Sequence, residues 1–154
     1  MREHANCITI RVAPPINELR ELYMSTRFKN WKQPAIKHGV PTKWNWLVLN
    51  PEGLTLGKHT DIGAYTLLVA RHGIFIEDEV QIGSHCAVYS HSTIDGKKGK
   101  VTLKRNCRIG THSSIMPGVT VGENAVVGAH SFVTKDVAPN TVVAGVPARN
   151  LKKG

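Results

Sequence analysis

The sequence predicts an all-β fold, a parallel β-solenoid built from six-residue repeats, and two periodic features support this prediction. An aliphatic residue recurs at every sixth position between Leu103 and Val133. A small or β-branched residue stands four positions after each aliphatic one. The aliphatic positions are Leu103, Ile109, Ile115, Val121, Val127 and Val133, and the others are Cys107, Ser113, Val119, Ala125, Ser131 and Val137.

The pleat of a β-strand explains this spacing. A small residue and the next aliphatic residue are two positions apart, so both side chains point to one face of a short strand. The apolar spacing of three and four residues that indicates an α-helix is absent from this stretch. Three such strands make one triangular coil of about 18 residues, and successive coils stack at the strand spacing of about 4.8 Å. The period alone leaves the handedness open.

Residues 1–50 do not share the repeat, and we expect them to form an N-terminal, partly helical cap on a β-helix domain over residues 51–154. The Pro14-Pro15 pair can start a helix, because residues 16–23 carry an apolar stripe. An open solenoid end exposes apolar side chains and unpaired strand groups, so it needs a cap. Trp31, Trp44 and Trp46 either belong to this cap or form a surface on which a sugar stacks.

Two interruptions divide the repeat, which begins weakly near Leu56. Residues 73–75 shift the frame by two positions. Residues 95–100 are too polar for a strand, and three extra residues there predict a loop over 94–102 that protrudes from the coil. An excursion from a regular solenoid is a common place for function. This frame assigns the inward small positions before the loop to Thr60, Thr66, His72, Val80, Cys86 and Ser92.

Charge and cysteine content bound the function classes. A formal charge of +9 and a pI of about 9.8 favour a nucleic acid, an acidic membrane surface or a phosphorylated small molecule as partner, or reflect a solvated basic surface. A nucleic-acid partner has only the charge behind it, because no basic stretch interleaved with aromatic residues is present. The three cysteines include no CxxC pair, so Cys86 and Cys107 are interpreted as packing residues rather than metal ligands.

The sequence shows neither a signal peptide nor an apolar run of membrane-spanning length. We therefore expect a cytoplasmic protein without a membrane span.

His91 lies at the corner directly before the predicted loop. A corner residue beside a loop is exposed, so its imidazole can meet a substrate. The ordinary pKa of histidine also lets it take a proton near neutral pH. His91 is the candidate catalytic residue, although a surface histidine without a function fits the same position.

Three stretches of sequence carry a resemblance to a known family. They are Ile-Gly-Thr-His at 109–112 with Pro-Gly-Val-Thr-Val-Gly at 117–122, Val-Gly-Ala at 127–129 with Val-Thr-Lys-Asp at 133–136, and Ala-Gly-Val-Pro-Ala-Arg at 144–149. On these motifs, residues 56–151 resemble the hexapeptide-repeat acyltransferases, particularly the galactoside, maltose and xenobiotic acetyltransferase group. The resemblance implies a left-handed solenoid, a homotrimer, and acetyl-CoA bound between neighbouring subunits. The left hand is an exception to the usual rule for parallel crossovers and rests on the resemblance alone.

The resemblance also implies roles for individual residues. His91 matches the catalytic histidine, a general base that takes a proton from an acceptor hydroxyl or amine. The backbone N–H of Thr111 matches an oxyanion donor. The remaining matched positions contact the cofactor, two of them with cationic side chains suited to its phosphates, and no metal is implied. These cofactor positions are Ala129, Thr134, Lys135 and Arg149.

The expected acceptor is a sugar, which can be nucleotide-linked, acetylated on oxygen or nitrogen during surface-polysaccharide synthesis such as that of lipopolysaccharide. A hydroxyl acceptor needs a base more than an amine does, so a histidine base favours O-acetylation. The acceptor pocket is expected from the loop over 94–102, the face near Arg71 and His72, and residues 1–50.

Two other classes stay open from the sequence. The solenoid also resembles that of the γ-class carbonic anhydrases, in which three histidines hold zinc across a subunit interface, and His85, His91 and His112 could supply such ligands. A non-catalytic solenoid that acts as a scaffold or binding module would keep the same aliphatic ladder.

Overall fold

The structure is a computed structural model, and it describes residues 28–151. The chain divides into two units, Met1–Trp31 and Lys32–Gly154. The solenoid belongs entirely to the second unit. The helix expected after Pro14 and the third cysteine, Cys7, lie outside the described residues.

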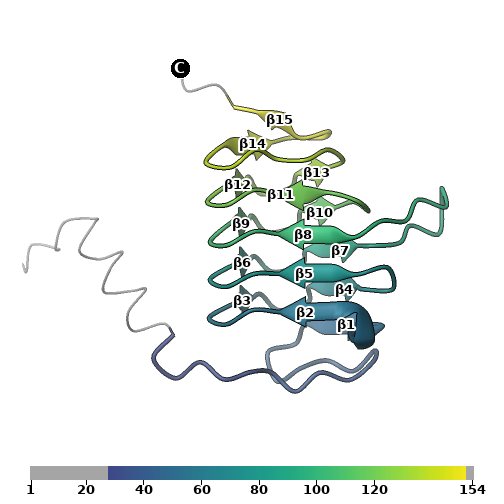
Figure 1. Cartoon of the computed structure of the whole chain (residues 1–154), viewed down its shortest axis with the longest axis vertical. Coiled ribbons are helices and arrows are strands. Elements are labelled where there is room, and N and C mark those ends of the chain that lie inside the picture. The colour runs from purple at the N-terminus through teal and green to yellow at the C-terminus, as the bar shows by residue number, and fades with distance from the viewer. Residues whose placement is uncertain (1–27, 152–154) are drawn as a thin grey trace, which may run out of the picture. The chain divides into compact units, whose positions relative to one another are not determined.

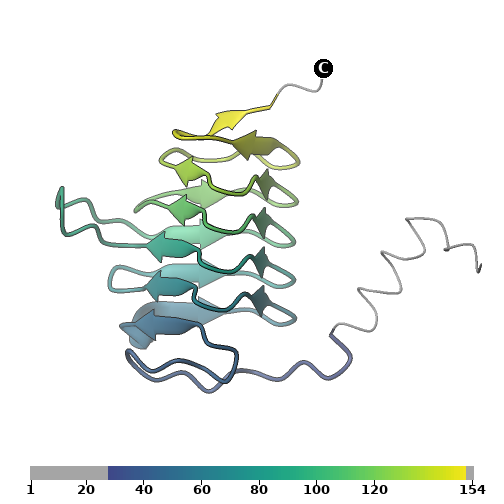
Figure 2. The ribbon, with the colours of Figure 1, turned by 180° about the vertical axis from the view of Figure 1, so that it is seen from behind.

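The second unit is a parallel β-helix of short strands stacked in coils (Figures 1 and 2). A single 3-10 helix, η1, occurs among residues 28–151. In chain order the elements are β1 (Leu47–Leu49), η1 (Pro51–Gly53), β2 (Leu54–Leu56), β3 (Asp61–Ile62), β4 (Leu67–Val69), β5 (Ile74–Ile76), β6 (Gln81–Ile82), β7 (Ala87–Tyr89), β8 (Val101–Leu103), β9 (Arg108–Ile109), β10 (Ser114–Ile115), β11 (Thr120–Val121), β12 (Val126–Val127), β13 (Phe132–Val133), β14 (Val142–Ala144) and β15 (Arg149–Asn150).

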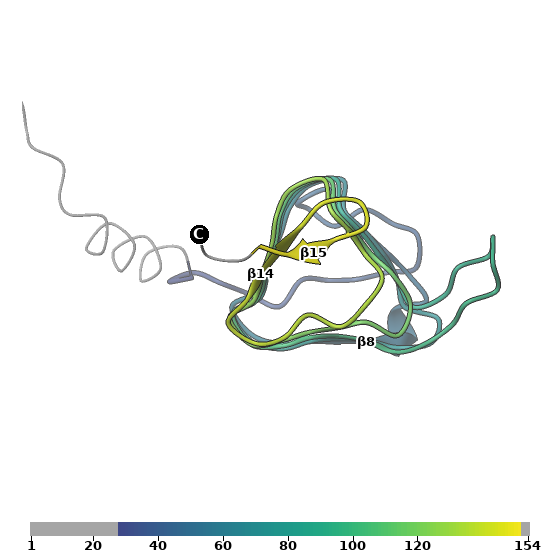
Figure 3. The same ribbon diagram turned by 90° about the horizontal axis from the view of Figure 1, so that it is seen from above.

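The strands form three sheets that enclose a triangular cross-section (Figure 3). Sheet 1 has the order β1-β4-β7-β10-β13, and sheet 2 has the order β11-β8-β5-β2. Sheet 3 has the order β15-β14-β12-β9-β6-β3. The neighbouring strands pair in parallel, except that β15 returns antiparallel to β14 at the C-terminal end.

Three corners join the sheets, and each is named here by what it carries. The loop corner, from sheet 1 to sheet 2, comprises residues 50–53, 70–73, 90–100, 116–119 and 134–136. The asparagine corner, from sheet 2 to sheet 3, comprises residues 57–60, 77–80, 104–107, 122–125 and 138–141. The histidine corner, from sheet 3 back to sheet 1, comprises residues 63–66, 83–86, 110–113 and 128–131.

Inward-pointing aliphatic side chains fill the space between the three sheets. The six aliphatic positions from Leu103 to Val133 are all buried, as the six-residue period predicts. Cys86 and Cys107 are buried and free, which confirms their interpretation as packing residues. Burial raises the pKa of the Cys86 thiol, and it raises the pKa of Cys107 to about 12. Both thiols are therefore protonated and shielded at neutral pH.

The pairing register gives the coil lengths and corrects the expected size of the excursion. Leu47 pairs with Leu67 and Leu67 with Ala87, so the first two coils have 20 residues. Ala87 pairs with Ser114, so the coil with the loop has 27 residues, whereas the next coil has 18. The loop thus adds nine residues to the regular coil, not three. Because the repeat has a period of six residues, insertions of three and of nine residues shift its frame by the same amount. The frame alone could therefore not distinguish them.

Two inward positions expected from the frame are also corrected. His72 and Ser92 do not point into the core. Ala70 and Ser90 are fully buried in their place. In each long coil the inward residue of the loop corner comes two positions earlier than an unbroken repeat would place it. The extra residues of the coil therefore follow this inward residue and do not precede it.

Residues just before the coil close its N-terminal end. Trp46 is buried, and Ile36 packs against the core. Trp44 is 42% exposed, with the Lys43 ammonium 4.2 Å from its ring centroid. Since β1 starts at Leu47, the coil begins slightly before the boundary expected at residue 51.

The histidine and asparagine corners repeat one backbone turn in each coil. Each turn has a non-glycine residue at positive φ, such as His112 at 58° and Asn124 at 57°. The coils approach closely there. A Cβ on Gly110 would lie 2.4 Å from the backbone nitrogen of Ala129 on the next coil, so only glycine fits. Among residues 28–151 no helical segment has the length and apolarity that a bilayer crossing requires.

Candidate active site

His91 lies at the base of the loop that projects between β7 and β8 (Figures 1 and 3). Two backbone hydrogen bonds tie the arms of the loop together: Ser92 N–H to the Lys97 carbonyl (2.8 Å), and Gly99 N–H to the Ser90 carbonyl (3.0 Å). They place His91 opposite Lys98 in an isolated antiparallel bridge. The base of the loop is therefore a short ladder, which fixes the backbone that carries the half-buried His91.

His72, from the preceding coil of the loop corner, contacts His91. The two imidazole rings meet edge to face, with centroids 5.1 Å apart and planes at 83°. The His72 backbone N–H donates to the hydroxyl of buried Ser90 (2.9 Å), which in turn donates to the Val69 carbonyl (2.7 Å). Desolvation holds the pKa of His72 below its usual value, and the charges of His91, Lys98 and Arg71 lower it further.

Thr111 lies on the histidine corner, away from His91. Its hydroxyl donates to the Ser84 carbonyl (2.7 Å) and lies 3.0 Å from Nδ1 of His112. Its backbone N–H has no hydrogen-bond partner among residues 28–151. Among the described residues, this corner thus offers a backbone donor that the ladder hydrogen bonds of the coil leave unused.

The four residues expected to contact a cofactor fall into three places. Ala129 follows Thr111 by one coil on the histidine corner, and Thr134 and Lys135 lie on the loop corner. Arg149 belongs to β15 at the C-terminal end of sheet 3, where its guanidinium donates to the Ala148 carbonyl (3.0 Å). All four residues are exposed.

One chain does not bring His91 and Thr111 together. His91 follows a strand of sheet 1, whereas Thr111 precedes one, so the two residues stand at opposite ends of that sheet. Crossing the sheet takes about five or six residues, or roughly 15–20 Å. A site that uses both groups requires a second chain whose histidine corner meets the loop corner of the first.

A ladder of aromatic rings runs along the histidine corner. The imidazoles of His85, His112 and His130 stack at centroid distances of 4.7 and 4.8 Å, with Tyr65 continuing the row. Parallel rings aim their nitrogen lone pairs side by side rather than at one point. His91 lies on another corner, so the three histidines considered as zinc ligands do not converge in one chain. Residues 28–151 contain no group of three or more potential ligands placed to hold a metal ion.

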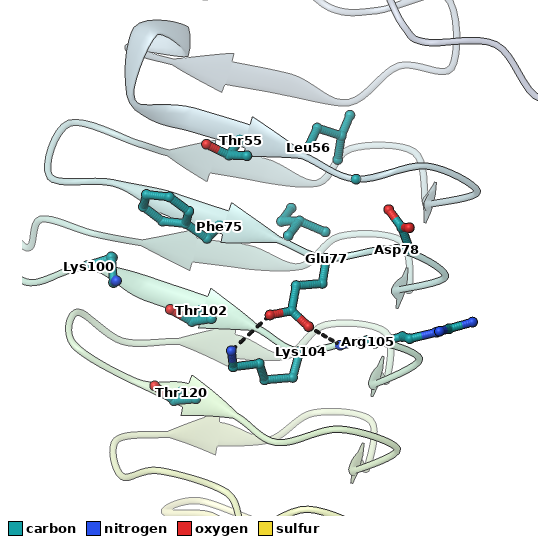
Figure 4. A pocket seen from close by; sticks show the side chains of 12 residues that line it. Thr55, Leu56, Phe75, Glu77, Asp78, Lys100, Thr102, Lys104, Arg105 and Thr120 are labelled. Atoms are coloured by element: carbon teal, nitrogen blue, oxygen red, sulfur yellow. Dashed lines mark hydrogen bonds and ion pairs between the residues drawn. The ribbon is translucent and has the colours of Figure 1, made fainter.

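A groove of about 700 Å³ crosses the outer face of sheet 2 (Figure 4). Its floor includes outward-pointing Thr55, Phe75 and Thr102, from neighbouring strands. The Lys100 ammonium lies 4.8 Å from the centroid of the Phe75 ring. None of the predicted catalytic or cofactor residues lines the groove, whereas Lys100 and Thr102, from the segment expected to form part of the acceptor pocket, do.

An ion-pair network at one wall of this groove was not predicted from the sequence. Glu77 accepts hydrogen bonds from the Lys104 ammonium (2.8 Å) and the Arg105 backbone N–H (2.9 Å), one coil later (Figure 4). Glu79 pairs with the Arg105 guanidinium at 2.9 Å. The sequence does contain a signal for these pairs, because residues of opposite charge are separated by about one coil. That signal could be recognised only once the length of the loop, and so of the coil, was known.

Comparison with known proteins identifies the family. Residues 100–135 match the family model described as bacterial transferase hexapeptide (six repeats). The hexapeptide-repeat-containing acetyltransferase VCA0836 from Vibrio cholerae superposes with a TM-score of 0.61 and 30% identity, over 70% of each chain. The chain belongs to the hexapeptide-repeat acetyltransferase family. Its fold is accordingly the left-handed parallel β-helix.

Two further relatives show the range within the hexapeptide-repeat family. Galactoside O-acetyltransferase from Escherichia coli K12 is 53% identical over 53 residues, which cover 34% of this chain and 26% of the relative. AntD, an N-acyltransferase from Bacillus cereus solved with dTDP and 3-hydroxybutyryl-CoA, is 25% identical with a TM-score of 0.63, over 88% of this chain and 86% of that one. The chain matches only about a quarter of the length of its curated relatives.

Proposed function

We propose that this protein is an acetyl-CoA-dependent acetyltransferase that acetylates a hydroxyl or amino group of a sugar. The observation that carries the proposal is the position of His91, at the base of the one long excursion in the described coils of a hexapeptide-repeat solenoid. Relatives support the substrates: VCA0836 has been solved with acetyl coenzyme A, and AntD with a dTDP-linked amino sugar. The proposed setting is surface-polysaccharide synthesis in the cytoplasm.

His91 acts as the general base in this proposal. Its imidazole takes the proton of the acceptor O–H or N–H as that atom attacks the thioester carbonyl carbon. The resulting tetrahedral intermediate carries a negative oxygen. When it collapses, the C–S bond breaks, and the imidazolium returns its proton to the thiolate. The products are the acetylated sugar and free CoA.

The backbone N–H of Thr111 is the proposed donor to the negative oxygen. A preorganised donor of this kind accounts for about 10²–10³ in rate in acyl-transfer enzymes. The absence of a competing acceptor for this N–H among residues 28–151 supports the assignment. Ala129 and Thr134 would contact the cofactor, and Lys135 and Arg149 would bind its phosphates.

The separation of the two corners supports a homotrimer. With sheet 1 of each subunit facing a threefold axis, every loop corner meets the histidine corner of a neighbour. His91 and Thr111 then come from different chains, and three equal sites close the ring. Light scattering should give three times the 16.9 kDa chain mass. A monomer in solution would contradict both the interface and the site.

Calorimetric titration of acetyl-CoA into metal-stripped protein, at two salt concentrations, tests the proposal. We expect about one cofactor per chain, with weaker binding at higher salt because the phosphates meet cationic side chains. Thiol release in the presence of candidate sugars then identifies the acceptor and the acylated atom. Without cofactor binding the proposal fails, and zinc analysis would separate a carbonic-anhydrase-like enzyme from a scaffold.

A further inference from the structure

The loop corner gathers cations around His91. Arg71 and His72 come from the corner between β4 and β5, and Lys98 comes from the returning arm of the loop. His72 contacts the His91 ring, and Lys98 is paired with His91 across the ladder. Arg71 directly precedes His72 in the chain, and Lys98 is bridged to the histidine that His72 contacts. Four groups that can bind an anion thus lie at the base of one loop.

The nearby carboxylate does not neutralise this cluster. Asp95 accepts a hydrogen bond from Ser92 and pairs with the Lys97 ammonium at 2.9 Å, and both contacts hold its pKa well below the usual range. Arg71 and Lys98 have no ion-pair partner among residues 28–151. Two uncompensated cations beside two imidazoles repel one another, and a bound anion would relieve that repulsion.

The backbone that carries the cluster is fixed before any ligand arrives. Buried Ser90 holds the His72 backbone N–H, and the Gly99 N–H holds the Ser90 carbonyl. One serine therefore links the corner that bears Arg71 and His72 to the arm that bears Lys98. Because the backbone is already held, binding a phosphate orders only the exposed side chains of the cluster.

We propose that Arg71, His72 and Lys98 form an anion subsite that holds a phosphate of the acceptor beside His91. This inference rests on the proposed acetyltransferase function and deepens it. The acceptor class becomes a phosphorylated or nucleotide-linked sugar rather than a neutral one. Arginine binds two phosphate oxygens at once, and lysine adds a point charge.

The order of the coils assigns this subsite to the acceptor and not to the cofactor. Arg71 and His72 lie one coil before His91, or about 5 Å along the axis. Lys135, proposed to bind cofactor phosphate, lies two coils after His91 on the same corner, or about 10 Å in the other direction. Along the axis, Arg71 and His72 therefore stand on one side of the base, Lys98 stands beside it, and Lys135 stands on the other side, as two substrates that meet there require.

Titration with inorganic pyrophosphate tests the subsite directly. The full chain, labelled with ¹³C-histidine and saturated with CoA, is followed by ¹H–¹³C spectra at constant ionic strength, with His72→Asn and His91→Asn to assign signals. We expect the His72 and His91 signals to move together in the wild type. Arg71→Gln with Lys98→Gln should raise the dissociation constant at least tenfold, while thermal stability is unchanged.

A control pair removes the same charge elsewhere. Lys58→Gln with Arg105→Gln, at exposed positions of the asparagine corner, should stay within twofold of wild type. Equal weakening in the control, signals that do not move, or loss of pyrophosphate binding when CoA saturates the protein would each overturn the subsite. The last outcome would indicate that these cations bind the cofactor rather than the acceptor.

Further arms separate related outcomes. Tighter binding of pyrophosphate than of inorganic phosphate supports a diphosphate-linked acceptor, and equal binding supports a phosphate monoester. If CoA does not bind at all, the proposed function fails. The pyrophosphate titration without CoA then still tests the anion subsite on its own.

Discussion

The histidine corner and the loop corner both join neighbouring sheets of the coil, but the turns of the first are uniform and those of the second vary. In the histidine corner each turn repeats the one before, with His85, His112 and His130 in one left-handed backbone conformation and their rings stacked. In the loop corner the turns differ in length, and positive φ falls on Asn50, Gly73, Gly96 and Gly118. The repeated corner keeps the coils in register, and the variable one is free to carry chemistry.

The sharpest test of this comparison substitutes one glycine in each corner. In Gly110→Ala the new Cβ would overlap the backbone of the next coil, with the nitrogen of Ala129 2.4 Å away. We expect a loss of more than about 4 kcal/mol in unfolding free energy, or no folded protein. Gly96→Ala meets no atom within 4 Å and strains only φ, at +69°, so it should cost about 1 kcal/mol. Denaturant unfolding measures both, and equal losses would contradict the distinction.

A pair of histidine substitutions separates chemistry from structure. His91→Ala should lower acetyl transfer by about 10²-fold or more through loss of the base, with unchanged affinity for CoA and unchanged melting temperature. His59→Asn is the control on the asparagine corner, where asparagine tolerates the same positive φ of 55°. It should keep full activity. Near-wild-type turnover in His91→Ala would remove this residue from the mechanism.

The two cations proposed to bind cofactor phosphate, Lys135 on the loop corner and Arg149 in β15, should affect affinity alone. Lys135→Gln and Arg149→Gln should each raise the KM for acetyl-CoA about tenfold, because each removes a charged hydrogen bond to phosphate. The KM should also depend less on salt in the variants. Steady-state kinetics at two salt concentrations provide the measurement, and an unchanged KM in both variants would place the cofactor elsewhere.

The smallest expected effect comes from comparing an ion pair that joins two coils, Glu77 with Lys104, with an ion pair inside the loop, Asp95 with Lys97. Glu77→Gln removes an acceptor that joins two coils, and solvent screening limits the cost to about 1 kcal/mol. The Lys104 hydrogen bond, followed by the Arg105 N–H, holds the pKa of Glu77 below 4.5. The stabilisation is therefore present above pH 4.5 and lost as the pH falls below it. Asp95→Asn should leave the melting temperature unchanged. If the loss of stability in Glu77→Gln does not depend on pH, the negative charge of Glu77 is not the source of the stabilisation.

The sequence predicted the core well because its period has one physical cause. A side chain that faces the interior recurs wherever the chain completes one side of the triangle, so Ile109, Ile115 and Val121 were assigned correctly from spacing alone. The buried cysteines followed from the same rule. The prediction failed at His72 and Ser92, where the frame could not tell on which side of a corner the extra residues lie.

The candidate site was only partly predictable. His91 and its loop could be located from the interruption of the repeat, and the closing motifs pointed to the family. That His72 contacts His91, with Arg71 and Lys98 beside them, depends on which coil stacks on which. This order follows from the pairing of Val69 with Tyr89, and no local pattern contains it.

The register also says where this molecule tolerates insertions and deletions. From sheet 2 to sheet 3 and from sheet 3 to sheet 1, the number of residues between successive strands stays the same from coil to coil. The pairings of Ile74 with Val101 and of Gln81 with Arg108 illustrate this, because both are offset by 27 residues. Every change in coil length occurs between sheet 1 and sheet 2. A loop of another length can therefore be exchanged at this corner with the strand pairing at the other two corners kept, and the acceptors that such chimaeras use would show whether the loop contributes to the proposed acceptor pocket.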